Sequence, residues 1–171
     1  MKLWPGWLVV MAAACGNSAS APPITATATH PPNATVVRVI DGDTIDAKFD
    51  ANFGDVTERI RLIGIDTPET KKPNTPIQCF GPEASKHTKE LLPEDTPIFV
   101  ERDIVARDDY GRLLGYVYRS SDNLFVNLDI VREGFAHVLT IPPNVNYASN
   151  FVEAARDAEA NNRGLWSRCS G

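Results

Sequence analysis

The chain has 171 residues, of which 43% are hydrophobic and 23% charged, as in an ordinary globular domain with some additional sequence. No apolar run approaches the ~20 residues that a membrane-spanning helix needs. The formal net charge is -5, which excludes a broadly basic surface. Any polyanionic partner should therefore bind weakly outside a local basic cleft.

Residues 1–15 are predicted to form an export signal of the lipoprotein type. Lys2 gives a positive start, and a short apolar segment follows it. Residues 12–16, Ala-Ala-Ala-Cys-Gly, resemble a bacterial lipobox, although alanine replaces the usual leucine, and imply a lipid on Cys15. The alternatives are plain secretion after an A-x-A site at 19–21 and a cytosolic chain with an apolar start. We expect an exported protein, either secreted or anchored to the membrane of the cell envelope through this lipid.

Residues 16–33 are small, polar and proline-rich, which predicts a disordered linker before a folded domain at 34–171. If Cys15 carries lipid, Cys79 and Cys169 remain. An even remainder in an oxidising compartment favours a disulfide between them. The alternative is a pair of free, buried thiols.

The folded part begins with β-branched runs and ends with helical patterns. Strands are predicted at 35–40, 44–49, 57–65, 98–102 and 113–118. Helices are predicted at 81–92, 126–133 and 147–161. Asp41-Gly42 predicts a hairpin between the first two strands, because both residues tolerate a positive φ. Strands mostly precede helices, so we expect an α+β fold, namely an OB-fold five-stranded β-barrel with three flanking helices.

Two aspartates are expected at one rim of this barrel. Asp43 follows the hairpin turn and Asp66 follows the apolar end of the third strand, so both lie near a sheet end. Their carboxylates, with a carbonyl such as that of Thr67, suit Ca²⁺ completed by water and phosphate. The three histidines are scattered and indicate no zinc site. The alternative for Asp43 is a residue that only shapes the turn.

Two arginines and a glutamate would complete a site for phosphodiester hydrolysis. Arg61 lies in an Ile- and Leu-rich strand, where a guanidinium needs a partner, and its planar fork matches phosphate oxygens. Arg112 follows a turn and could reach the same rim. Glu69 could orient or deprotonate a water molecule. The alternatives are a structural salt bridge for Arg61, an exposed turn residue for Arg112 and a solvated loop residue for Glu69.

Together these segments resemble the staphylococcal nuclease (thermonuclease) family. The resemblance rests on motifs in the family's order, spread over most of 36–167: Val39-Ile40-Asp41-Gly42-Asp43-Thr44, Arg61-Leu62-Ile63-Gly64-Ile65-Asp66-Thr67-Pro68-Glu69, Gly81-Pro82-Glu83-Ala84-Ser85, Asp108-Asp109-Tyr110-Gly111-Arg112 and Gly164-Leu165-Trp166-Ser167. It implies an OB-fold and Ca²⁺-dependent cleavage of DNA and RNA to products with 3′-phosphates. We expect a monomer.

The family's site positions fall on the calcium ligands Asp43, Asp66 and Thr67 (through its carbonyl), the phosphate-binding Arg61 and Arg112, the general base Glu69, and Tyr110 near the bound nucleotide. The staphylococcal enzyme has tyrosines where residues 140–143 read Thr-Ile-Pro-Pro. Because stacking contributes ~1–3 kcal/mol per base, we expect weaker binding of short substrates. Two other functions stay open: a non-catalytic nucleic-acid-binding OB module, and an oligosaccharide or adhesion module favoured by the acidic net charge.

Overall fold

The computed structural model describes Met1, residues 29–70 and residues 76–169. The predicted export signal, Cys15 and most of the predicted linker lie outside these residues. Within the described ranges, no helix is long and apolar enough to cross a membrane.

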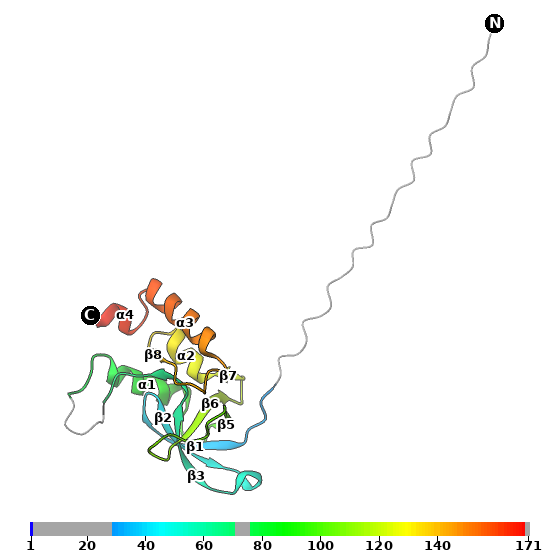
Figure 1. Ribbon diagram of the computed structural model, residues 1–171, viewed down its shortest axis with the longest axis vertical. Helices are drawn as coiled ribbons and strands as arrows, with labels where there is room; N and C mark the ends of the chain where they lie inside the picture. Colours follow the sequence, from blue (N-terminus) through cyan, green and yellow to red (C-terminus); the bar gives the residue numbers. More distant parts are fainter. Residues whose placement is uncertain (2–28, 71–75, 170–171) are drawn as a thin grey trace.

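A closed five-stranded β-barrel forms the centre of the domain (Figure 1). Its strands are β1 (Ala34–Asp41), β2 (Thr44–Phe49), β3 (Thr57–Leu62), β5 (Pro97–Glu101) and β6 (Leu113–Arg119). The antiparallel order β3-β2-β1-β5-β6 is closed by a parallel pairing of β3 with β6. The two-residue strand β7 (Leu124–Phe125) pairs antiparallel with the end of β6. The predicted OB-type α+β fold is confirmed.

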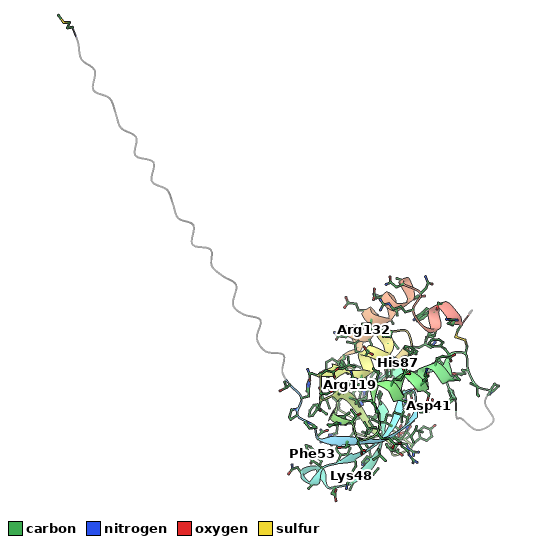
Figure 2. The ribbon with its side chains drawn as sticks, turned by 180° about the vertical axis from the view of Figure 1, so that it is seen from behind. Asp41, Lys48, Phe53, His87, Arg119 and Arg132 are labelled. Atoms are coloured by element: carbon green, nitrogen blue, oxygen red, sulfur yellow. A yellow bond between two sulfur atoms is a disulfide. The ribbon has the colours of Figure 1, made fainter. Side chains whose placement is uncertain are left out.

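Helices cover one side of the barrel, away from the β2–β3 hairpin tip that carries Lys48 and Phe53 (Figures 1 and 2). They are α1 (Gly81–Leu91), α2 (Val126–Arg132) and α3 (Ala148–Ala160), with a short α4 (Leu165–Arg168) at the end of the chain. The three predicted helices therefore match the observed ones to within a residue at each end. Pro82 opens α1 and Glu83 lies in its first turn, where the helix dipole favours a carboxylate.

The core lies inside the barrel and under the helices. Along β2 and β3 the inward residues Ile45 and Ile60 pair with each other and are fully buried. Ile98, Val117 and Ile130 are buried with them, and each such side chain contributes ~1.5–3 kcal/mol. The outward residues of β1–β3 thus remain available for polar contacts.

The predicted third strand at 57–65 is wrong in its length, because strand β3 ends at Leu62. β4 (Gly64–Asp66) leaves the barrel and pairs with β8 (His137–Leu139) in a separate two-stranded sheet. Gly64 has φ +85°, and a Cβ there would lie 2.3 Å from the Phe151 ring. A glycine therefore permits both the turn and the approach of α3. This break places Asp66 at the end of β4, beside β8.

The predicted hairpin is present, but the reason given for its glycine is wrong. Asp41 pairs with Thr44, so that Gly42 and Asp43 form the turn, and Gly42 is outside the left-handed region. A Cβ on Gly42 would instead lie 2.7 Å from Thr67 Oγ1. Glycine is needed here because the loop after β4 packs directly against the turn, which brings Thr67 to Asp43.

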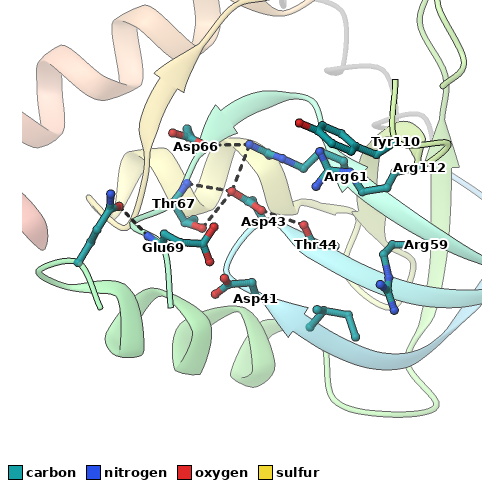
Figure 3. Close-up of a pocket in the computed structure, with 12 residues that line it drawn as sticks. Asp41, Asp43, Thr44, Arg59, Arg61, Asp66, Thr67, Glu69, Tyr110 and Arg112 are labelled. Carbon is teal, nitrogen blue, oxygen red and sulfur yellow. Dashed lines mark hydrogen bonds and ion pairs between the residues drawn. The ribbon is translucent and has the colours of Figure 1, made fainter. Parts of the chain in front are cut away.

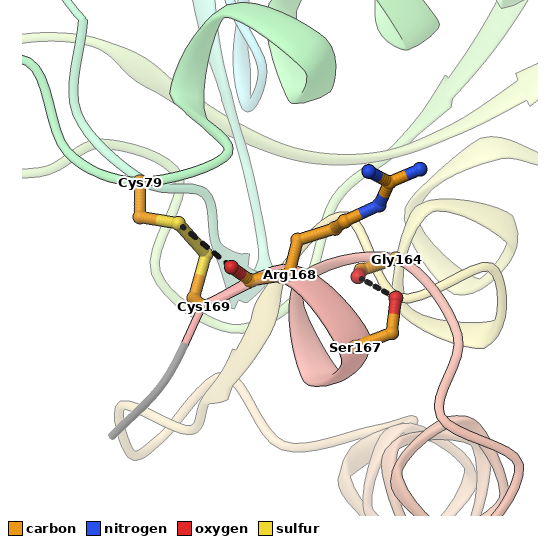
Figure 4. Close-up of a disulfide and its surroundings, with 5 residues drawn as sticks. All are labelled: Cys79, Gly164, Ser167, Arg168 and Cys169. Atoms are coloured by element: carbon orange, nitrogen blue, oxygen red, sulfur yellow. Dashed lines mark hydrogen bonds between the residues drawn. A yellow bond between two sulfur atoms is a disulfide. The ribbon is translucent and has the colours of Figure 1, made fainter.

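Residues before the first barrel strand and after the last helix also make contacts with the rest of the domain. Buried Asn33 donates to the Val100 carbonyl (3.0 Å) and accepts from the Val100 amide (2.8 Å), so packing begins before residue 34. At the other end, Cys79 and Cys169 form a disulfide with Cα atoms 5.9 Å apart (Figure 4). The bond ties the segment before α1 to the residue after α4.

Candidate active site

A cleft of about 540 Å³ opens where the β1–β2 turn meets the segment after β4 (Figure 3). It brings together all seven residues assigned from the sequence to substrate or cation binding and catalysis: Asp43, Arg61, Asp66, Thr67, Glu69, Tyr110 and Arg112. Its remaining lining residues are Ile40, Asp41, Thr44, Arg59 and Gln78. Residues far apart in the sequence therefore share one solvent-facing space.

Asp43 is buried and joins the turn to the loop after β4. Its Oδ2 accepts hydrogen bonds from the amide and the hydroxyl of Thr67, both at 3.0 Å. Its Oδ1 accepts from the Thr44 hydroxyl at 3.0 Å. This carboxylate does more than shape the turn, because it also binds the loop after β4 and lines the cleft.

Arg61 is anchored on one side and faces two carboxylates on the other. Its Nη1 donates to the carbonyls of Leu62 (2.9 Å) and Ile65 (2.8 Å). Its Nη2 lies 2.9 Å from Asp66 Oδ1 and 3.2 Å from Asp43 Oδ2, and the side chain is only 13% exposed. The salt bridge that was the alternative interpretation of Arg61 is therefore present. The same guanidinium also lines the cleft.

The same contacts identify two carboxylates that could hold a cation. Oxygens of Asp43 and Asp66 converge on one positively charged nitrogen, so both carboxylates already point toward a common positive group. Partial burial raises the pKa of Asp66, and the charge of Arg61 opposes this rise. Among the described residues, no group of three or more His, Cys, Asp or Glu side chains is arranged for a metal. The protein would thus contribute two carboxylates and a carbonyl to a hard cation such as Ca²⁺, leaving positions for water and phosphate.

Glu69 lies at the opposite end of the cleft from Arg59 (Figure 3). Its amide donates to Gln78 Oε1 at 2.7 Å, and its Oε1 accepts from the Thr70 amide at 3.0 Å. Gln78, which the sequence analysis did not single out, therefore helps to fix the backbone of Glu69.

Asp41, which the sequence indicated only as part of a turn, also lines the cleft. It accepts hydrogen bonds from the Thr70 hydroxyl (2.8 Å) and the Gly42 amide (2.9 Å). Burial raises its pKa above the ordinary value, those two hydrogen bonds oppose the rise, and the neighbouring Glu69 and Asp43 reinforce it. The carboxyl groups of Asp41, Asp43 and Glu69 therefore lie close enough at this end of the cleft to influence one another.

Arg112 and Tyr110 come from a turn that a single carboxylate organises. Asp108 Oδ1 accepts from the amides of Tyr110 (3.0 Å) and Arg112 (2.9 Å), and Oδ2 accepts from Arg112 Nε at 2.6 Å. The Arg112 guanidinium lies 5.4 Å from the centre of the Tyr110 ring, which is 85% exposed. Arg112 is therefore a positioned side chain, and Tyr110 offers an open aromatic face beside it.

A second, more apolar cleft of about 360 Å³ adjoins the first. The two share Arg61, Tyr110 and Arg112. The wall beyond these residues includes Leu139, Ile141, Pro142, Pro143 and Leu114. The segment that departs from the staphylococcal pattern thus lies beside the catalytic candidates, and it carries aliphatic side chains.

Comparison with known proteins gives one consistent result. The family model described as staphylococcal nuclease homologue matches residues 59–168. A thermonuclease of Staphylococcus intermedius is 42% identical over 133 residues, 78% of this chain and 75% of the relative. A thermonuclease of Staphylococcus hyicus is 39% identical over 77% of this chain and 74% of the relative. The endonuclease YncB of Bacillus subtilis is 38% identical over 80% of this chain and 62% of the relative.

Proposed function

The chain belongs to the staphylococcal nuclease family, and from this premise we propose that it is a calcium-dependent nuclease acting on DNA and RNA. The observation that carries the proposal is one cleft lined by two convergent aspartates, two anchored arginines and a glutamate. Relatives named thermonuclease and endonuclease support the same reaction class.

The residues of the cleft divide the chemistry among them. Arg61 and Arg112 hold the scissile phosphate and stabilise the negative charge that develops on its oxygens. Glu69 accepts the proton of the attacking water. Water oxygen bonds to phosphorus while the bond to the 5′ oxygen breaks, and that oxygen leaves as a hydroxyl after gaining a proton. The products are a 3′-phosphate and a 5′-hydroxyl.

Asp43, Asp66 and the carbonyl of Thr67 would hold the calcium ion. When bound there, Ca²⁺ supplies additional positive charge against the phosphate. The convergence of both carboxylates on Arg61 Nη2 supports this assignment. Arg61 lies between the two aspartates and offsets part of their negative charge.

The test is digestion of plasmid DNA and of RNA by the purified protein with Ca²⁺ and then with excess chelator. We expect cleavage of both only with Ca²⁺, and fragments whose 5′ ends accept phosphate from a kinase without prior dephosphorylation. A protein that shifts DNA in a gel without cutting it would be a binding module. A protein that neither binds nor cuts would contradict both.

We further propose export, with a lipid on Cys15. The bond between Cys79 and Cys169 supports export, because disulfides persist in oxidising compartments. Mass spectrometry of the mature N-terminus tests it. A lipidated cysteine as the first residue is expected, whereas an unprocessed N-terminus would contradict export.

A further inference from the structure

A row of three charged side chains crosses the outer face of the barrel beside the cleft. Arg38 on β1 pairs in register with Asp46 on β2, and Asp46 pairs with Arg59 on β3. The adjacent residues Ile45 and Ile60 face the core, so this row faces outward. The row was not part of the motifs that indicated the catalytic site.

The row carries one more positive than negative charge. Arg38 Nε and Nη2 bond to Asp46 Oδ2 at 2.9 and 2.8 Å. Arg59 Nε bonds to Asp46 Oδ1 at 2.8 Å, and its Nη2 bonds to Oδ2 at 3.2 Å. These hydrogen bonds, that of Arg59 first, lower the pKa of Asp46. Asp46 therefore stays ionised and orients two guanidiniums, each of which has five N–H donors and so further donors for another acceptor.

Both arginines remain accessible, with side chains 59% (Arg38) and 48% (Arg59) exposed, whereas Asp46 between them is 9% exposed. The negative partner is covered and the positive groups face solvent. An anion approaching this face therefore meets guanidinium first, and the planar fork suits phosphate oxygens.

Arg59 lies at the outer end of the catalytic cleft, where a neighbouring cleft begins. It lies two residues before Arg61 on β3, about 6.6 Å along the strand and on the same face. It lines both the catalytic cleft and a neighbouring cleft of about 490 Å³, which Tyr110 and Arg112 also line. Figure 3 places Arg59 at the end opposite Glu69. A strand held by Arg61 and Arg112 can thus leave the cleft past Arg59.

Two carboxylates near this exit have arginine partners. Glu58 lines the neighbouring cleft of about 490 Å³, and its Oε1 lies 2.6 Å from Arg107 Nη2. Asp108, at the base of the turn, is held by Arg112 at 2.6 Å. A polyanion that follows this path therefore meets two carboxylates that are paired with arginines. It also meets the row of Arg38, Asp46 and Arg59, which carries one net positive charge.

We propose that Arg38 and Arg59, oriented by Asp46, form a second phosphate subsite for the nucleic-acid backbone outside the scissile position. The inference rests on one part of the proposed function, the binding of a polynucleotide in the cleft, and does not depend on its cleavage. It assigns the protein a preference for long single strands over short ones, although its net charge is acidic.

The test compares a long oligothymidylate with a dinucleotide in chelator, where cleavage does not interfere, by fluorescence anisotropy. The main variant is Arg38→Gln/Asp46→Asn/Arg59→Gln, which loses two positive charges and one negative charge and leaves no unpaired aspartate. Arg156→Gln, on the exposed face of α3, changes the net charge equally and is the matched control. Arg38→Gln alone keeps the bonds between Asp46 and Arg59, and thermal melting confirms that each variant is folded.

We expect the triple variant to bind the long strand roughly three- to tenfold more weakly, as for one or two exposed charge pairs. Its salt dependence should become shallower by about 0.7 in the slope of log affinity against log salt for each phosphate that the variant no longer neutralises. Dinucleotide binding should stay at the wild-type level, and Arg38→Gln should show part of the loss.

An equal loss for both ligands, or a loss no larger than in Arg156→Gln, would overturn the subsite. Cleavage of DNA by the wild-type protein with Ca²⁺ is measured in the same preparation. If the wild-type protein does not cut but the length-dependent loss appears, the nuclease proposal fails and the phosphate subsite stands. If it cuts and the loss is absent, the subsite alone fails.

Discussion

The two adjoining clefts share Arg61, Tyr110 and Arg112 but differ in the wall beyond them. The larger cleft is built from carboxylates and guanidiniums whose positions are fixed by hydrogen bonds within 2.6 to 3.2 Å. The smaller one ends in the aliphatic residues Leu139, Ile141, Pro142 and Pro143. The polar wall can orient a phosphate, whereas the aliphatic wall offers a base no aromatic face apart from that of Tyr110.

From this difference we expect the protein to recognise a polynucleotide through its backbone more than through its bases. Directional bonds to phosphate need fixed donors, which the polar cleft supplies. Base affinity comes largely from stacking, worth ~1–3 kcal/mol per base, and the aliphatic wall supplies little of it. Changes on the polar side should therefore alter turnover, and changes on the aliphatic side should alter affinity.

The largest effect is expected for Arg61→Ala. Loss of a charged donor to the scissile phosphate should lower kcat by at least ~10²-fold, as when an oxyanion donor is removed. Arg61→Lys keeps the charge but loses the planar fork and should recover only part of the activity. Steady-state kinetics on single-stranded DNA, with melting curves for both variants, measures this. Arg119→Ala, in an ion pair with Asp122 outside both clefts, is the control. Near-wild-type kcat in folded Arg61→Ala would remove the residue from the mechanism.

For Glu69→Gln we also expect kcat to fall by at least ~10²-fold, because an amide cannot accept the proton of water. The substitution preserves shape, so the Kd for DNA in chelator should stay near the wild-type value. Kinetics and anisotropy together measure the split between turnover and binding. A fall in affinity with unchanged kcat would instead assign Glu69 to substrate binding.

Local patterns in the sequence predicted much of this architecture and missed contacts between distant segments. The β-branched runs and the helix starts and stops gave the barrel strands and α1–α3, because burial on one face imposes a period. The break at Gly64 was missed because it depends on Phe151, which is far along the chain. The role of Gly42 was missed because Thr67, not the turn itself, demands the space.

The candidate site divides in the same way. The motifs named the residues that the cleft collects, because carboxylates at strand ends and an arginine within an apolar strand can be recognised from the local sequence. Arg59 was not named, because a polar residue on an outer strand face is ordinarily solvated. Its significance appears only when the register places it beside Asp46 and the barrel places it beside the cleft.

A smaller effect is expected on the aliphatic side. Ile141 is 62% exposed and lines that cleft, so Ile141→Tyr should add a stacking surface without filling the core. We expect the KM for a dinucleotide to fall by roughly five- to tenfold, the lower part of the range for one stacked base, with kcat unchanged. Ile141→Leu is the control, because it keeps an aliphatic side chain. An unchanged KM would show that bases do not enter this cleft.

The smallest effect on turnover is expected for Cys79→Ser/Cys169→Ser, which leaves the lining of both clefts unaltered. Loss of a bond between residues 90 positions apart should lower stability by up to about 4–5 kcal/mol in the chain-entropy model, and often less. Thermal melting should therefore shift downward, while kcat at low temperature stays at the wild-type value. An unchanged melting curve would argue against the bond. A fall in kcat would carry a different meaning, because Cys79 follows Gln78, whose side chain holds the Glu69 amide at 2.7 Å. In that case the disulfide would help to position Glu69, the proposed general base, as well as stabilising the fold.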